Sequence, residues 1–190
     1  MIHAELDSDS RELVRLLAEW SSCVRFAYSL FREGRNFRGI QFAAKERYLS
    51  LNSRYIFAAV KDAHRKHKRT EDQPSIIFGG RALYERFTTG KISLAEWRFA
   101  RDGKMYVRTE LTKSDNSCLS VKRAEGGFYL ELLIGDSGFV DRDIQTYPLS
   151  VSDEVAAHLS GLLASRGACK VRIRRKEITK YTVTLDFRVD

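Results

Sequence analysis

The chain has 190 residues, 43% of them hydrophobic, and its 33 lysines and arginines outnumber 25 aspartates and glutamates for a formal net charge of +8. This length supports one full hydrophobic core or two small ones, and the excess of cations favours a polyanionic partner such as nucleic acid. The three cysteines lie far apart and form no CxxC pair, so neither a zinc site nor a disulfide framework is expected.

The N-terminal residues, MIHAELDSDS, lack the basic and apolar stretches of a secretory signal. No apolar run approaches the roughly 20 residues of a membrane span. Together with the separated cysteines, these features predict a cytoplasmic protein. We expect no membrane partner, no cofactor and no bound metal.

The first predicted helix begins after a cap at Asp9 or Ser10 and ends near Arg32. Its apolar residues recur three or four positions apart and share one face: Leu13, Leu17, Trp20, Val24, Tyr28 and Phe31. The opposite face carries the candidate nucleic-acid contacts Arg11, Arg15, Arg25 and Arg32.

Two more helices are predicted before residue 70. Gly34 should end the first helix, and the second covers 37–48 and carries Ile40, Phe42 and Ala43. The third begins after Asn52 or Ser53 and continues to Lys68, with an inward stripe of Tyr55, Ile56, Ala59, Val60 and Ala63. A second cationic face results, with the candidate contacts Arg54, Lys61, Arg65 and Lys68.

The segment from Ile76 to Glu110 has the most particular order of parts. An apolar pair meets Gly79-Gly80, and a short aromatic and basic helix follows. Gly90-Lys91-Ile92-Ser93 then opens another helix, which leads to a strand near Lys104. We expect this segment to join a helical half of the chain to a strand half.

Beyond Gly103 the apolar period changes to two, which predicts strands. Met105 and Val107 should point inward, and Lys104 and Arg108 are candidate contacts. Strands at 118–123 and 128–134 flank a glycine turn, Glu125-Gly126-Gly127. A helix at 152–164, capped by Ser152, should bury Val155, Leu159, Leu162 and Leu163.

Two final strands are predicted at 170–174 and 179–189. In the first, the candidate contacts Lys170, Arg172 and Arg174 share one face and Val171 and Ile173 the other. In the second, Val183, Leu185, Phe187 and Val189 should point inward. The fold class is therefore α+β, with a helical part at 1–103 and a small antiparallel barrel or sandwich with one helix at 104–190.

Other features could carry chemistry. His64 and His67 form an HxxH pair, but the surrounding lysines and arginines would repel a metal ion. Gly79-Gly80 could receive a phosphate or simply form a tight turn. Exposed rings could stack on bases, although each ring taken singly is more often a core residue: Tyr28, Tyr48, Tyr84, Tyr106, Phe37 and Phe87.

Three segments, taken in their order along the chain, resemble the N-terminal region of TnpB-like proteins. The segments are SCVRFAYSLFREG, LNSRYIFAAVKDAHRKHKR and IIFGGRALYERFTTGKISLAEWRFARDGKMYVRTE. These are transposon-encoded RNA-guided nucleases related to type V CRISPR effectors. The most specific part is the succession of FGG, GKIS, tryptophan and arginine between Phe78 and Arg101. The likeness covers nearly the whole chain.

The resemblance implies a helical recognition part that interrupts a small β-barrel, the wedge domain, with residues 2–6 as a further barrel strand. It implies guide RNA and target DNA as partners, and a nuclease domain in a separate domain or subunit, because the sequence stops at Asp190 where the family's nuclease domain would begin. No catalytic residue is assigned. The sequence does not distinguish a fragment, a split subunit or a shortened relative.

Two other functions stay open. A small metal-dependent nuclease would use the carboxylates Glu131, Asp136, Asp141 and Asp143, although aspartates in loops more often serve the turn itself. A basic protein-interaction module would bind an acidic protein through the same cationic faces.

Overall fold

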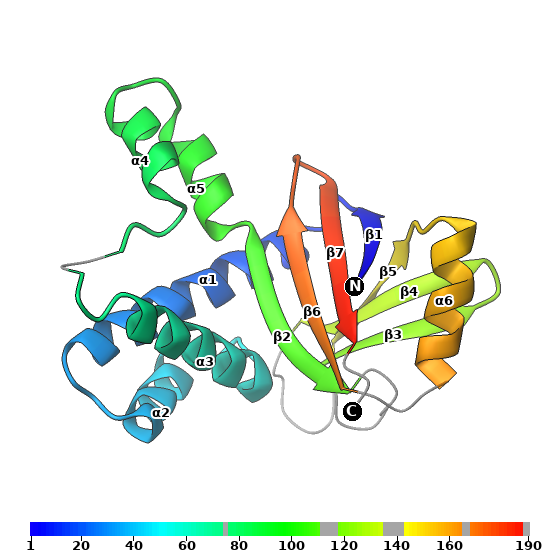
Figure 1. Cartoon of the computed structure of the whole chain (residues 1–190), viewed down its shortest axis with the longest axis horizontal. Helices are drawn as coiled ribbons and strands as arrows, with labels where there is room; N and C mark the ends of the chain where they lie inside the picture. The colour runs from blue at the N-terminus through cyan, green and yellow to red at the C-terminus, as the bar shows by residue number, and fades with distance from the viewer. Residues whose placement is uncertain (74–75, 111–117, 135–142, 165–167, 188–190) are drawn as a thin grey trace. The chain divides into compact units, whose positions relative to one another are not determined.

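The structure, a computed structural model, describes residues 1–73, 76–110, 118–134, 143–164 and 168–187. Helices and antiparallel sheets make it an α+β protein, as predicted (Figure 1). The chain forms two compact units: a helical unit, Leu13–Met105, and a strand unit made of Met1–Glu12 and Tyr106–Asp190. Each unit has its own buried apolar residues.

Helix α1 (Arg11–Arg32) buries the apolar stripe that the sequence predicts, with every member of the stripe at most 6% exposed. Cys23 and Ser21 are buried beside it, so the apolar face is wider than a single stripe. The helix ends at Arg32, and Gly34 just beyond it has a φ of 80°, the left-handed conformation that glycine adopts at low cost. The amides of Gly34 and Arg35 bond back to the carbonyls of Phe31 and Leu30.

Asparagine side chains begin the next two helices, α2 (Phe37–Arg47) and α3 (Ser53–Arg69). Asn36 accepts from the Gly39 amide at 2.8 Å, and Asn52 accepts from the Arg54 amide at 2.9 Å. The predicted inward stripe of α3 is buried. In α2, Ile40 and Ala44 lie one turn apart on the buried face, whereas Phe42 is 64% exposed.

Helices α4 (Arg81–Thr88) and α5 (Leu94–Asp102) form a hairpin in which neither helix has a buried residue. Gly79, Gly80 and Gly90 all have positive φ, so the chain turns sharply before and after α4. Ser93 caps α5: its Oγ accepts from the Glu96 amide, and the Glu96 carboxylate accepts from the Ser93 amide.

The first antiparallel sheet of the strand unit has the order β1-β7-β6-β2. Its strands are β1 (Ile2–Asp7), β7 (Lys180–Phe187), β6 (Ala168–Arg175) and β2 (Lys104–Glu110). The expected N-terminal strand exists and pairs with β7, with Ile2 opposite Leu185. Val183 and Leu185 are buried as predicted and Phe187 is half-buried, while Val189 lies outside the described residues.

The second sheet has the order β3-β4-β5. Strands β3 (Leu119–Ala124) and β4 (Gly127–Leu133) form the predicted hairpin, with Gly126 and Gly127 at positive φ. Strand β5 (Ile144–Leu149) was not predicted. It contains Pro148, which a strand at the edge of a sheet accommodates because one side of its backbone needs no partner.

The described residues do not support the expected closed barrel. An isolated bridge between Glu5 and Ser150 joins the two sheets, but among the described residues no pairing connects β2 to β3, which would be needed to close the ring. Alternation of apolar residues specifies which face of a strand is buried, but it does not specify which edges pair. The α+β class therefore stands and the barrel does not.

Helix α6 (Asp153–Ala164) begins within one residue of its predicted start, but only Leu159 of its expected inward residues is buried. Val155, Leu162 and Leu163 are half-buried. Within the described part of the chain, no helix has the length and hydrophobicity needed to cross a membrane.

Candidate nucleic-acid interface

The outer face of α3 carries a row of exposed cations, Arg54, Lys61 and Lys68. They are seven residues apart, which puts successive members about 10.5 Å apart along the helix at 1.5 Å per residue. Among the described residues, no acidic side chain pairs with any of the three. We call these three residues the α3 row; its charge is available to an external anion.

Arg65, the fourth predicted contact on α3, is partly engaged within the helix. Its guanidinium lies 2.9 Å from the Asp62 carboxylate, which also pairs with Lys66. Asp62 is well covered, with a side chain 14% exposed, whereas Arg65 is 44% exposed. Arg65 therefore has less free charge to offer than the α3 row.

The arginines of α1 differ among themselves. Arg11 and Arg32 are exposed, and Arg32 donates to the Gln73 carbonyl at 3.0 Å. Arg15 is 71% exposed and pairs with Glu19 one turn later at 2.8 Å. The charges along this face are thus partly neutralised or held by neighbouring groups.

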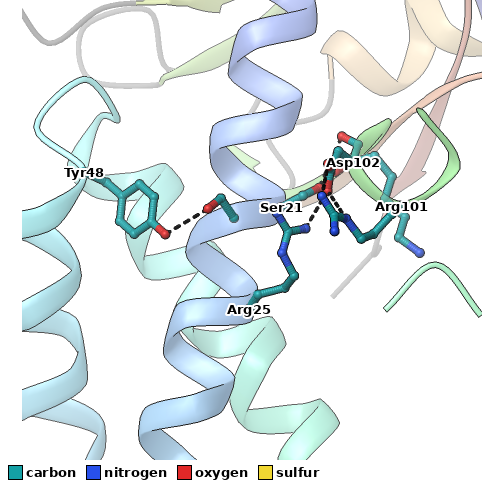
Figure 2. Close-up of polar contacts among 7 residues, drawn as sticks. Ser21, Arg25, Tyr48, Arg101 and Asp102 are labelled. Atoms are coloured by element: carbon teal, nitrogen blue, oxygen red, sulfur yellow. Dashed lines mark hydrogen bonds and ion pairs between the residues drawn. The ribbon is translucent and has the colours of Figure 1, made fainter. Parts of the chain in front are cut away.

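Arg25 belongs to a polar cluster that fastens the end of α5 to α1 (Figure 2). Its guanidinium pairs with the Asp102 carboxylate, to which Arg101 also donates at 2.9 and 2.7 Å. Ser21, buried on α1, donates to the Asp102 and Lys104 carbonyls at 3.3 and 3.0 Å. We call Ser21, Arg25, Arg101 and Asp102 the α1–α5 anchor. With Arg25 25% and Asp102 18% exposed, this charge serves the fold.

In the strand unit, β6 presents its basic residues on one face. Arg172 and Arg174 are exposed and Lys170 is half-buried, while Val171 and Ile173 on the other face are at most 1% exposed. The neighbouring strand puts Asp186, Thr184 and Thr182 opposite these three cations. Alternate residues of a strand lie about 6.8 Å apart, which gives a second, independent cationic row.

The two predicted contacts in β2 are placed differently. Lys104 is exposed, and its carbonyl accepts from Ser21 within the anchor. Arg108 lies within β2, but its side chain is outside the described residues.

Most of the aromatic residues singled out in the sequence pack internally. Tyr28 is buried and bonds Thr70, Tyr48 bonds Ser22 at 3.0 Å, and Tyr106 is half-buried. Phe87 stacks on Trp97 with ring centroids 5.1 Å apart, and Tyr84 contacts the same ring. Arg101 lies 4.6 Å from the Trp97 centroid, so these rings pack against one another within the α4–α5 hairpin, although Tyr84 is 36% exposed.

Phe57 on α3 is an exposed ring that was not among the predicted stacking residues; it is 44% exposed. It lies three residues after Arg54 and four before Lys61, within the α3 row. That spacing was the available signal, because residues three and four apart on a helix are neighbours.

His64 and His67 lie among rings instead of carboxylates. Phe31 stacks on His67 and contacts His64, and Phe37 also contacts His64. Desolvation and the nearby Lys68 and His67 lower the pKa of His64. Within the described residues, no group of three or more histidines, cysteines or carboxylates is arranged to hold a metal ion.

The carboxylates considered for a nuclease are only partly described. Glu131 forms an ion pair with Lys122 at 2.9 Å and accepts a hydrogen bond from Ser120 at 2.8 Å. Asp143 is exposed and immediately precedes β5. Asp136 and Asp141 lie outside the described residues. Glu131 is thus held by its own sheet neighbours.

The three cysteines are free and buried. Burial raises the pKa of Cys23 and that of Cys169 to about 12. Since the thiolate is the reactive form, neither residue is suited to nucleophilic chemistry at neutral pH.

No protein-family model matches this chain, and no curated protein matches it.

Proposed function

We propose that the chain is a non-catalytic nucleic-acid-binding module that holds RNA. The observation that carries this proposal is the α3 row, in which three exposed cations share one helix face with no acidic partner among the described residues. Ordinary surface cations are interspersed with acids, as on α1, where Arg15 pairs with Glu19. An unneutralised row is suited to a chain of phosphates.

The face of β6 supports the same function from the strand unit. Arg172 and Arg174 are exposed, and the half-buried Thr182 lies opposite Arg174, where its hydroxyl could donate a hydrogen bond to a phosphate oxygen. The spacing of about 6.8 Å between successive side chains allows each cation to contact a different phosphate of one nucleic-acid strand. Both units thus present exposed cations suited to contacts with the sugar–phosphate backbone.

We further propose that this module is the recognition and wedge part of a TnpB-like or type V CRISPR effector. It would hold the guide RNA and the duplex of guide and target DNA, in the cytoplasm, while a separate domain or subunit supplies the nuclease. The order of the FGG, GKIS and tryptophan motifs supports this assignment. The antiparallel pairing of the N-terminal strand with β7 is consistent with it.

The test measures binding of the full chain to labelled single-stranded RNA over a range of salt concentrations. Replacing Arg54, Lys61 and Lys68 together by glutamine should weaken binding, and the slope of log K against log salt should fall by about 2, at roughly 0.7 per phosphate contact. A matched control replaces the exposed Arg81, Arg86 and Lys91 of the hairpin by glutamine. Absent or salt-insensitive RNA binding by the native protein would refute the proposal.

The alternative is a protein-interaction module. It would be favoured if the protein, purified without nuclease treatment, carried no nucleic acid and formed a stable complex with an acidic protein. In that case, the α3-row variant should lose the protein partner and not RNA.

A further inference from the structure

Phe57 lies in the middle of the cationic face of α3. Its ring is 44% exposed, and Arg54 and Lys61 lie one turn before and one turn after it. A single exposed apolar side chain is common on protein surfaces and needs no explanation. The arrangement here is more specific, because the ring is bracketed by two cations that have no acidic partner among the described residues.

Neighbouring side chains orient the Phe57 ring, but among the described residues none of them is an aromatic ring stacked parallel to it. Phe37 contacts Phe57 with centroids 5.9 Å apart and planes inclined at 73°, and Lys61 Nζ lies 5.8 Å from the Phe57 centroid. By contrast, the Phe87 and Trp97 rings stack at 8°, and Phe31 and His67 at 11°. Among the described residues no ring stacks in parallel on Phe57, so a flat ligand could do so.

We propose that Phe57 is a stacking platform for an unpaired base of single-stranded RNA, with Arg54 and Lys61 binding the adjacent phosphates. This inference rests on the proposed RNA-binding function and specifies the form of RNA that α3 receives. Lys61 can leave the ring for a phosphate when a base takes its place, because a lysine side chain is flexible. Phe37 holds the platform from the side.

A paired base could not use this platform. In a duplex the bases stack on one another, so their faces are not available to a protein ring, whereas an unpaired base has a free face. Stacking also tolerates any base, which suits a surface whose other contacts are to phosphate. The α3 face should therefore prefer single-stranded RNA over duplex RNA of the same length.

The test compares the affinity of the full chain for a fluorescent oligouridylate and for a base-paired RNA duplex of the same length. Phe57→Ala should weaken binding to the single strand about tenfold, within the range measured for loss of one stacked base, and leave duplex binding unchanged. The salt slope should stay as in the native protein, since no charge is removed. Phe57→Tyr should restore binding, and quenching of a fluorescent base analogue by the native ring should disappear in Phe57→Ala.

The matched control is Phe42→Ala on α2, where the native ring is even more exposed, at 64%, and has no cation over it among the described residues. That variant should bind as the native protein does. Circular dichroism verifies that each variant is folded.

Three results would overturn the inference. If the α3-row variant loses RNA and Phe57→Ala does not, stacking is refuted while the proposed function stands. If Phe57→Ala weakens single-strand and duplex binding equally, the ring acts through the shape of α3 and not by stacking. If the native protein binds no RNA, the inference and the proposed function fall together.

Discussion

The α3 row and the α1–α5 anchor both contain basic side chains within the helical unit, but the two groups do different work. Arg25 and Arg101 converge on Asp102, and all three side chains are at most 25% exposed. The cations of the α3 row are exposed and have no acidic partner among the described residues. Net charge alone cannot separate these roles. Exposure and partners assign the first group to folding and leave the second accessible for the binding that we propose.

The largest expected effect is on the anchor. Asp102→Asn keeps the shape of the side chain but removes the counter-charge of Arg25 and Arg101, so we expect a loss of about 2 kcal/mol in the free energy of unfolding. Urea denaturation measures it. RNA affinity of the folded variant should not fall, because no cation is lost. A variant of native stability with weakened RNA binding would contradict the division between anchor and row.

The second prediction concerns the glycines before α4. Gly79 and Gly80 both have positive φ, but a Cβ at Gly79 would lie 3.2 Å from Arg101 Cβ, whereas one at Gly80 would meet nothing within 4 Å. Both alanine variants carry backbone strain of about 1–3 kcal/mol, because residues with a side chain rarely adopt these φ values. Gly79→Ala should cost about 1 kcal/mol more, since Arg101 must shift within the anchor.

Native-state hydrogen exchange of the α4 and α5 amides measures this difference, because a hairpin without buried residues can open locally. Gly80→Ala serves as the matched control for the backbone term. Equal protection in the two variants would show that the close approach at Gly79 is unimportant.

A smaller effect is expected at the cap of α5. Ser93 and Glu96 exchange two hydrogen bonds at the first turn, and Ser93→Ala removes one of them along with the contact between their side chains. We expect about 1 kcal/mol less protection of the α5 amides. RNA binding by the α3 row should be unaffected, and a large loss would mean that the hairpin takes part in binding.

Local sequence spacing was enough to predict the binding candidates but not the anchor. The α3 row and the buried stripe of the same helix follow from a period of 3.6, which needs only neighbouring residues. The partner of Arg25 is Asp102, 77 positions away. No periodicity connects residues so far apart. The helical period alone therefore groups Arg25 with the exposed arginines of α1.

The strand unit shows the same limit. The hairpin at Gly126 has a local signal and was predicted, whereas β5 was missed because Pro148 and the neighbouring aspartates indicate a loop. Which edges of the two sheets pair depends on contacts between residues far apart in the chain, and local patterns do not reveal those contacts.

A further prediction concerns the stability of the α3-row variant, the counterpart of the anchor variant Asp102→Asn. Replacing Arg54, Lys61 and Lys68 by glutamine should change the free energy of unfolding by no more than about 0.5 kcal/mol per residue, because exposed cations without acidic partners contribute little to stability. Urea denaturation beside the RNA titration measures both. Asp102→Asn should lower stability and leave RNA affinity unchanged, whereas this triple variant should lower RNA affinity and leave stability nearly unchanged. A strongly destabilised triple variant would show that the α3 row serves the fold.

The smallest expected effect is a pH dependence at the border of the α3 row. His64 lies against Phe31 and Phe37, and desolvation, followed by the charges of Lys68 and His67, lowers its pKa below the ordinary value of 6.5. The unfolded chain therefore binds a proton at a higher pH than the folded chain does. Stability should be full above pH 6.5 and decline as the pH falls below it toward the lowered pKa. Urea midpoints at several pH values should show a shallower decline for His64→Gln than for the native protein, and equal slopes would mean that the ring environment of His64 does not penalise its charged form.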